Sequence, residues 1–288
     1  MGCAAASAVL AGCGAVSPPT DRRSSTTTAI SRSDTGPPDV GPYTDRLVQV
    51  PDAAEYLFDY LPHYSWYRQR VPMRTSKAAL SGLLDGPSSA VLTPDAIEEY
   101  FYGAADGHRF HVLRHSSDRD SLVEALHTGG DFRRVEESDS DLTTVRDRRR
   151  VVGVGASLWV DVLVPAYAAV DPLDRFRLVV SGVRNGRPSF VDGYAAYDLL
   201  TAALQSGSYI ASRPSTAEDL GASAYGRQYV WVDESTARPE EVLVFEEERD
   251  PTTVRDLVSD TATIPETNAA SIDDVAVAGR TATVMKTT

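Results

Sequence analysis

Hydrophobic and polar residues follow two different periods along this chain, which predicts that strands and helices both contribute to the fold. From Phe110 to Arg114, side chains alternate as they do in a strand. The next segment has helical spacing, with Ser117 or Asp118 as its cap and Gly129-Gly130 at its end. The apolar face of this helix would consist of Leu122, Val123, Ala125 and Leu126.

The same criteria predict further elements on both sides of this unit. Helices are expected over residues 53–60, 93–103, 194–204 and 250–258, the second with Thr93 as cap and Pro94 in its first turn. Residues 171–185 also have helical spacing, although a strand is an alternative there because Leu178-Val179-Val180 is a continuous apolar run. Strands are expected over residues 64–74, 132–137, 142–146, 151–155, 209–212, 225–233, 242–245, 275–278 and 281–285.

These elements lack the regular strand–helix alternation of a doubly wound sheet. We therefore predict an α+β fold, in which antiparallel sheets are covered by helices on one face. A strand, a short helix and a hairpin occur twice, about 130 residues apart, which is a weak sign of an internal repeat. The domain over residues 44–288 is accordingly expected either as one body or as two related halves, about 44–165 and 166–288.

The N-terminal part has a different composition. Residues 17–43 are rich in Ser, Thr, Pro and Asp and contain little that could form a core, so we expect a disordered tether. Before it, a short apolar segment ends at Leu10-Ala11-Gly12-Cys13. The boundaries that follow are residues 1–12 for a signal segment, 13–43 for the tether and 44–288 for the domain.

Leu10-Ala11-Gly12-Cys13 resembles the lipobox of prokaryotic lipoproteins. In that family a membrane enzyme attaches lipid to the cysteine and the segment before it is removed. The resemblance implies that Cys13 is lipidated and that the mature protein is anchored at the extracytoplasmic face of the cell membrane. Because secretion signals carry a basic region that residues 1–12 lack, we expect the translation start to lie further upstream.

The charge composition restricts the kind of organism the protein comes from and the kinds of partner it can bind. The net charge is −13, and the chain contains 27 Asp, 14 Glu and 26 Arg but only 2 Lys. Short carboxylates hold water and cations with little exposed apolar surface, which is typical of a salt-adapted, haloarchaeal-type surface. A high-GC actinobacterial lipoprotein is the alternative. So acidic a chain lacks the basic footprint of nucleic-acid binding proteins, and no nucleic-acid partner is expected.

The chemistry-bearing residues form no recognised catalytic motif. The two cysteines, Cys3 and Cys13, both precede the domain, so neither a disulfide framework nor a thiolate metal site is expected in it. Three groups that could carry chemistry are better explained by structure alone. We expect His108, His111 and His115 to lie along a solvated strand edge and Gly153 to Ser157 to form a tight turn. Glu246-Glu247-Glu248, Asp139 and Asp141 are expected to be hydrated surface residues. A carboxylate pair of Asp161 and Asp192 has no local signature, and we expect no metal, no cofactor and no catalytic residue.

Aromatic residues gather at 56–67 and at 100–102. Most should pack in the core, and Tyr64, Trp66 and Tyr67 are the candidate binding surface for a protein or a glycan. The sequence thus favours a lipid-anchored, non-enzymatic binding protein whose membrane contact is the lipid on Cys13. The alternative is a secreted hydrolase whose carboxylate or serine site has no local motif. A solute-importer receptor fits less well, because the domain is short for two lobes.

Overall fold

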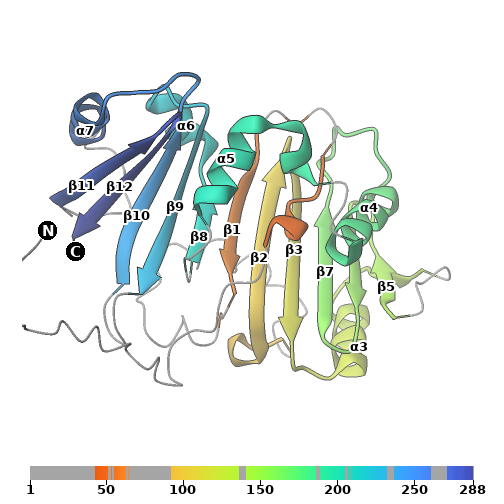
Figure 1. Cartoon of the computed structure of the whole chain (residues 1–288). Coiled ribbons are helices and arrows are strands. Elements are labelled where there is room, and N and C mark those ends of the chain that lie inside the picture. Colours follow the sequence, from red (N-terminus) through yellow and green to blue (C-terminus); the bar gives the residue numbers. More distant parts are fainter. Residues whose placement is uncertain are drawn as a thin grey trace, which may run out of the picture. The chain divides into compact units, whose positions relative to one another are not determined.

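Twelve antiparallel strands form one open sheet in the part of the chain that the structure describes (Figure 1). The computed structural model describes residues 43–50, 53, 55–62, 64, 92–135, 141–185, 189–204, 207, 209–231, 237–260 and 271–287, all within the unit Pro37–Thr288. The strands lie in the order β11-β12-β10-β9-β8-β1-β2-β3-β7-β6-β5-β4. Their bounds are β1 Leu57–Leu61, β2 Ile97–Ala105, β3 His108–His115, β4 Arg133–Arg134, β5 Thr143–Arg146, β6 Arg150–Val154, β7 Leu158–Leu163, β8 Tyr209–Ser212, β9 Ala224–Trp231, β10 Ala237–Val244, β11 Ser271–Ala278 and β12 Thr281–Thr287.

Helices cover both faces of this sheet. Along one face, α4 (Pro172–Asn185) and α5 (Ala195–Ala203) pack on a cluster that includes Phe58, Phe110 and Val160. On the opposite face, α3 (Arg119–Gly129) packs on a second cluster, and α7 (Pro251–Asp260) packs on a third together with α6 (Pro214–Asp219). Short 3-10 helices complete the described elements: η1 Tyr43–Arg46, η3 Pro94–Ala96 and η4 Phe190–Gly193.

The predicted α+β class with antiparallel strands is therefore confirmed. The sequence placed the helices on one face, whereas the structure divides them between two, because the strands bury side chains on both faces. On β7, for example, Val160 faces the α4 cluster and Trp159 faces the α3 cluster. In the part of the chain described, no helix is long and apolar enough to cross a membrane.

Two predicted helices are strands. Residues 57–61 form β1, and only residues 94–96 of the segment opened by Pro94 are helical before β2 begins at Ile97. Tyr100 and Phe101 suggested one helical face, but in β2 they point to opposite sides, Tyr100 to the α3 cluster and Phe101 to the α4 cluster. A strand buried on both faces loses its alternation, so its sequence imitates a helical spacing.

Four described helices, α3, α4, α5 and α7, confirm the sequence pattern, whereas α6 had not been predicted. Helix α3 is capped as predicted, because the Asp118 carboxylate accepts a hydrogen bond of 2.8 Å from the Ser121 backbone N–H. Residues 172–185 are helical rather than extended, and α5 and α7 lie where they were expected. Apart from Tyr64, the strand predicted over residues 64–74 lies outside the described residues.

Candidate functional site: a polar row and an arginine-lined groove

A row of mostly polar residues crosses the sheet on the face that carries α3 and α7. Residues directly opposite one another in neighbouring strands place their side chains on the same face. Following that register from β10 to β7 gives an uninterrupted path through seven strands. The row reads Glu241, Arg227, Ala211, Asp59, Tyr102, His111 and Asp161.

At its β7 end, the row opens into a groove of about 1420 Å³. The groove lies beside the start of β3, β4 and the turn between β5 and β6. Three aspartates and seven arginines line it, a positive balance in a chain whose net charge is −13. These arginines are Arg109, Arg133, Arg134, Arg146, Arg148, Arg149 and Arg150.

The arginines at the rim are available to a ligand. Arg109, Arg133, Arg134, Arg148 and Arg149 are exposed, and none of them forms an ion pair with a described residue. The Asp147 carboxylate accepts hydrogen bonds of 2.8 Å from the backbone N–H groups of Arg149 and Arg150, which hold it within the turn. Guanidinium groups bind carboxylates, phosphates and sulfates through paired donors, so this rim can hold an anion.

The base of the groove is held by one ion pair. Arg150 donates to both oxygens of Asp161, at 2.8 Å from Nε and 2.5 Å from Nη2. Asp161 is only 2% exposed, and the Arg150 guanidinium also lies 5.9 Å from the centre of the Phe132 ring. Both partners are thereby fixed in position, and the carboxylate oxygens are occupied.

His111 lies between these charges and the tyrosines of β2. Its Nδ1 is 3.3 Å from the Tyr100 hydroxyl, and its ring centre is 5.0 Å from that of Tyr102. Burial lowers the pKa of His111 to about 4; the nearby Asp161 carboxylate acts to raise it, and the cations Arg150 and Arg109 act to lower it further. The imidazole is therefore neutral at pH 7 and contributes a polar wall, not a charge.

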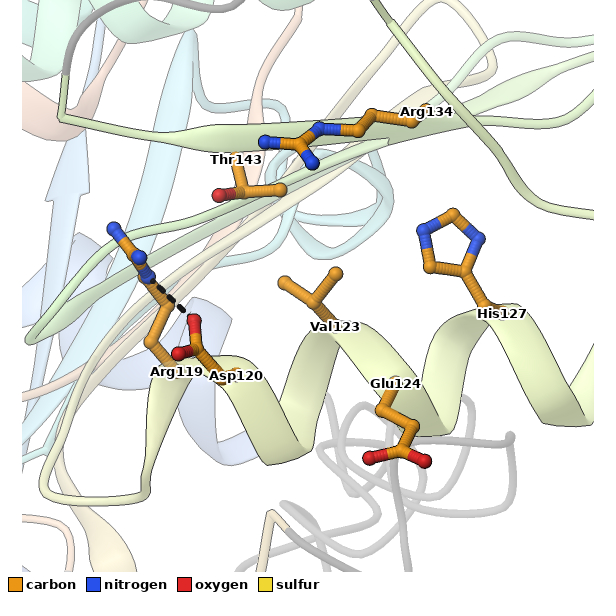
Figure 2. A pocket seen from close by; sticks show the side chains of 7 residues that line it. All are labelled: Arg119, Asp120, Val123, Glu124, His127, Arg134 and Thr143. Carbon is orange, nitrogen blue, oxygen red and sulfur yellow. Dashed lines mark hydrogen bonds and ion pairs between the residues drawn. The ribbon is translucent and has the colours of Figure 1, made fainter.

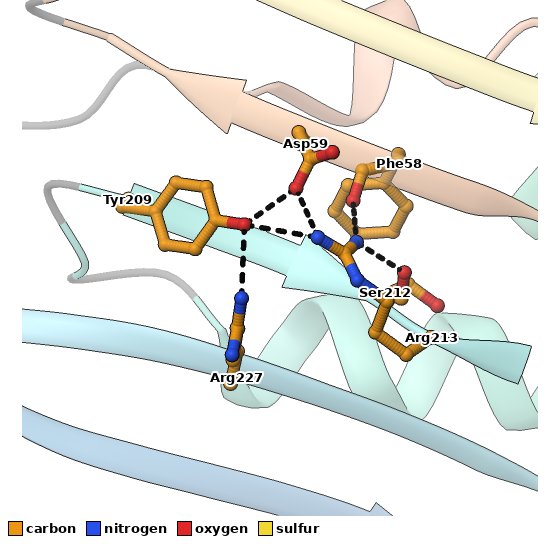
Figure 3. Close-up of polar contacts among 6 residues, drawn as sticks. All are labelled: Phe58, Asp59, Tyr209, Ser212, Arg213 and Arg227. Carbon is orange, nitrogen blue, oxygen red and sulfur yellow. Dashed lines mark hydrogen bonds and ion pairs between the residues drawn. The ribbon is translucent and has the colours of Figure 1, made fainter. Parts of the chain in front are cut away.

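The row continues into a second cluster at its centre (Figure 3). Tyr209 donates to Asp59 at 2.5 Å, and Arg213 donates to the same oxygen at 2.6 Å. Arg213 also donates to the Tyr209 hydroxyl, at 3.1 Å, and Arg227 does so at 3.4 Å. Arg213 and Asp59 thus form an ion pair, and the Tyr209 hydroxyl links this pair to Arg227.

A smaller hollow of about 430 Å³ lies between α3 and the strands β4 and β5 (Figure 2). Its lining includes Arg134, which also lines the groove, and the exposed His127. Arg119 is paired there with Asp120 at 3.1 Å. This hollow mixes charges of both signs, so it does not share the cationic character of the groove.

The three histidines singled out in the sequence are not at a strand edge. Strand β3 lies inside the sheet between β2 and β7, and His108 and His115 are 4% and 1% exposed. The expectation of a solvated edge is therefore wrong. Because 111 and 115 share one face and 108 occupies the other, the three side chains do not converge.

Other candidate residues lie apart from the groove. Ser157 is in the exposed turn between β6 and β7, which the backbone closes by a 2.7 Å bond from Gly155 to Leu158, as predicted for a tight turn. Asp192 binds the Ser189 backbone within η4, on the α4 side of the sheet, so it is not paired with Asp161. Within the described residues, no group of three or more His, Cys, Asp or Glu is placed to hold a metal ion.

The aromatic surface predicted at Tyr64, Trp66 and Tyr67 is described only in part. Tyr64 is 4% exposed, and its ring centre lies 6.2 Å from that of Tyr100 in the core. Trp66 and Tyr67, like Cys13, lie outside the described residues. A binding surface at these aromatic residues stays a prediction.

The sequence contained a signal for the groove that residue motifs did not reveal. Arg133-Arg134 and the run from Arg146 to Arg150 are dense arginine clusters in an acidic chain. Local charge density would have pointed to both segments. Their convergence with Arg109 depends on the pairing of β4 with β5 and of β3 with β7, which only the fold provides.

Comparisons with known proteins identify a similar fold but no family. No protein-family model matches the chain, and no curated protein sequence matches it. Crystal forms I, III and IV of TP0453 are similar in structure, with TM-scores of 0.47, 0.48 and 0.47 and identities of 8%, 9% and 10%. These matches cover 85–86% of this chain and 92% of the other. The likeness concerns the path of the chain alone.

Proposed function

We propose that this chain is a non-enzymatic binding protein, held at the outer face of a cell membrane by lipid on Cys13, whose domain binds an anionic ligand in the arginine-lined groove. The observation that carries the proposal is the reversal of charge. Seven arginines converge on one hollow of a protein that is otherwise strongly acidic. Unpaired like charges repel one another, so their concentration is best explained by a ligand of opposite charge.

The state of the groove floor favours binding over catalysis. Arg150 occupies both oxygens of Asp161, and His111 contacts the Tyr100 hydroxyl. A general base needs an available lone pair within reach of a substrate proton. Asp161 and His111 are each engaged by a neighbouring side chain, so neither supports the secreted-hydrolase alternative as a general base.

The anchor rests on the sequence. Leu10-Ala11-Gly12-Cys13 and the polar residues 17–43 fit a lipid-anchored protein whose domain stands away from the bilayer. The excess of Asp over Glu and of Arg over Lys fits a salt-adapted, haloarchaeal source. A lipid on Cys13 would place the groove outside the cytoplasmic membrane, where its ligand would be met.

Anion binding is tested by titration calorimetry with pyrophosphate and with citrate at low ionic strength. We expect heat of binding that weakens as salt is added, because screening shortens the reach of exposed charges. The double variant Arg109→Glu/Arg149→Glu should abolish it. Arg177→Glu, on the exposed side of α4 across the sheet, is the matched control and should bind as the parent does. Equal binding by both variants would refute an anion site in the groove.

Lipidation is tested by mass spectrometry of the protein isolated from its native host. We expect a diacylglyceryl-type mass increment on a chain that begins at Cys13, recovered with the membrane fraction. The Cys13→Ser variant should leave that fraction. An unmodified Cys13 with the preceding residues intact would disprove the anchor without affecting the groove.

A further inference from the structure

The loop between β7 and α4 carries exposed apolar residues beside the groove. Its residues 165–170 read Pro-Ala-Tyr-Ala-Ala-Val, and all of them are exposed or half-buried. Over the described parts of the chain, the large hydrophobic residues that are exposed are Tyr167, at 76%, and Val170, at 38%. Both belong to this loop. Exposed apolar side chains that gather at one place mark a contact with a partner or with a membrane.

The arginine-rich turn between β5 and β6 lies against this loop. The backbone N–H of Val164, at the start of the loop, donates a hydrogen bond of 3.0 Å to the carbonyl oxygen of Arg149. At the end of the loop, the Asp171 carboxylate lies 3.9 Å from the Arg146 guanidinium. Because these contacts hold the loop at both of its ends, the exposed Arg148 and Arg149 lie beside it.

The turn between β2 and β3 completes the same end of the sheet. The Tyr167 hydroxyl lies so close to Gly107 that a Cβ on this residue would clash with it. Gly107 has a φ of 73°, which glycine adopts without strain. Two residues further along, Arg109 is exposed and lines the groove. Residues 106–109, 146–149 and 165–171 together form one surface, the docking end.

Positive charge extends from the docking end into the groove. Arg146 and Asp171 compensate each other, and the Asp147 carboxylate is held by backbone N–H groups of its own turn. Asp106 is the one further carboxylate of the docking end. The exposed arginines of this surface also line the groove, and they are Arg109, Arg148 and Arg149. An apolar loop with an aromatic ring thus lies next to a cationic border.

We infer that the docking end binds the surface of an anionic lipid bilayer, where Tyr167 and Val170 enter the headgroup region and Arg109, Arg148 and Arg149 bind lipid phosphates. This inference rests on the proposed anion site and names its anion as lipid phosphate. Tyrosine is favoured at the boundary between lipid and water, because its ring is apolar and its hydroxyl stays hydrated. Each arginine near an anionic surface strengthens the attraction, and buried apolar area adds to it.

The tether proposed for residues 13–43 permits this contact. A flexible chain of about 30 residues has an end-to-end distance of ~30 Å, so the domain could reach the bilayer as well as stand away from it. Confinement near the membrane raises the effective concentration of lipid headgroups around the domain. One aromatic ring and a few arginines therefore suffice for reversible docking.

Other ligands account for fewer of these features. A small free anion would bind the arginines but would leave the apolar loop without a role. A protein partner of ordinary size covers ~800 Å² with several aromatic anchors at its centre, whereas here the apolar residues are confined to one loop. Single-stranded nucleic acid stacks successive bases on successive rings, and this loop has a single aromatic ring, that of Tyr167.

Vesicle sedimentation tests the inference with the full-length Cys13→Ser protein, in which lipid on Cys13 cannot contribute. We expect binding to vesicles of equal parts phosphatidylglycerol and phosphatidylcholine, at least tenfold tighter than to pure phosphatidylcholine and weakened by salt. Arg149→Glu removes a cation and adds an anion, so it should weaken this binding about thirtyfold. Arg280→Glu is the matched control, because Arg280 is exposed in the β11–β12 turn at the other side of the sheet.

Tyr167 distinguishes docking on a membrane from binding of a free anion. Tyr167→Ser should weaken vesicle binding about tenfold, because it removes most of the apolar area that enters the bilayer. The same variant should bind pyrophosphate as the parent does. In Tyr167→Trp, the fluorescence of the added tryptophan should move to shorter wavelength when phosphatidylglycerol vesicles are added, a change that the parent should not show.

The outcomes separate the membrane from the anion site. The docking end is overturned if phosphatidylglycerol does not improve vesicle binding, or if Tyr167→Ser binds vesicles as the parent does, while pyrophosphate binding keeps the anion site. It is also overturned if poly-glutamate or single-stranded DNA binds more tightly than the vesicles and loses affinity with Tyr167→Ser. A protein that binds neither vesicles nor pyrophosphate nor citrate would refute the anion site as well. Thermal unfolding of each variant checks that it remains folded.

Discussion

The Arg150 guanidinium and the Asp161 carboxylate meet in a two-point ion pair beneath the groove, with both carboxylate oxygens engaged. Their side chains are 20% and 2% exposed, so the pair is shielded from water on the aspartate side. Its geometry fixes Arg150, the cation at the base of the groove. The stability of this pair is therefore tied to the shape of the ligand site.

Asp161→Asn should destabilise the domain strongly. The amide would face Arg150 with a donor in place of an acceptor and would leave a half-buried cation unpaired, at a cost of ~3 kcal/mol in the free energy of unfolding. Asp171→Asn is the control, because Asp171 lies 3.9 Å from Arg146 on an exposed surface and should cost less than ~0.5 kcal/mol. Urea unfolding measures both. If both variants lose the same free energy of unfolding, burial does not strengthen the Arg150–Asp161 pair.

Protonation of His111 should destabilise the fold as pH falls. Its pKa is about 4 in the folded protein against an ordinary value of 6.5, so the unfolded chain binds more protons between these limits. The contribution of His111 to stability should be complete above pH 6.5 and should decline by ~3 kcal/mol toward pH 4. The groups that face the ring and set this response are Asp161, Arg150, Arg109, Tyr100 and Tyr102.

The variant His111→Gln isolates this contribution. Urea unfolding between pH 4 and 7 should show a flatter pH dependence than in the parent. If His111→Gln and the parent have the same slope, another group is responsible for the acid sensitivity. Carboxylate titration is common to both proteins and cancels in the comparison.

Lys286 and Glu241 form a second buried pair, 2.7 Å apart, with side chains 7% and 1% exposed. Lys286→Met should cost ~3 kcal/mol, because the Glu241 charge would be left uncompensated in a poorly solvated site. The double variant Lys286→Met/Glu241→Leu should regain most of that loss, since no charge then remains buried. Melting temperatures and urea midpoints of the parent, the single variant and the double variant measure this loss and its recovery. A double variant as unstable as the single one would contradict it.

Gly153 should resist replacement by alanine. A Cβ at this position of β6 would lie 2.5 Å from the Phe176 ring of α4, so Gly153→Ala should cost ~2 kcal/mol through overpacking. Adding Phe176→Leu should cost less in the Gly153→Ala background than in the parent, which a double-mutant cycle measures. Gly193→Ala is the control, because a Cβ there would contact nothing within 4 Å.

Several elements that the sequence located correctly have one buried face. Helix α3 has Leu122 and Leu126 buried, a side-chain cap at Asp118 and polar residues elsewhere, so its periodicity is undisturbed. The hairpin of β11 and β12 turns at Gly279, whose φ of 57° suits glycine. In each case local chemistry and burial agree.

The elements that the sequence misassigned or missed lie near the middle of the sheet. β1 and β2 are covered on both faces, and β7 follows a turn that concealed its start at Leu158. No local pattern distinguishes such strands from short buried helices. These segments become strands because they pair with strands that are distant in the sequence.

The candidate site likewise combines features visible in the sequence with contacts that only the fold creates. Arginine density was visible along the chain, but the groove needs β3, β4 and the β5–β6 turn to come together. The polar row is still less local, since its seven residues come from seven strands. Sequence spacing between Asp59 and Asp161 carries no trace of the register that aligns them.

The two free edges of the described sheet affect whether neighbouring copies of the protein associate. One edge is β4, only two residues long and made of Arg133 and Arg134, and the other is β11, whose pairing with β12 shifts between Ile272 and Asp274 and which exposes Asp273 and Asp274. The brevity of β4 and the irregular pairing of β11 hinder strand pairing between copies, and charge repulsion opposes the pairing of two identical edges. Crowded copies of the domain should thus stay separate despite an open sheet, and neutralising either edge should promote their aggregation.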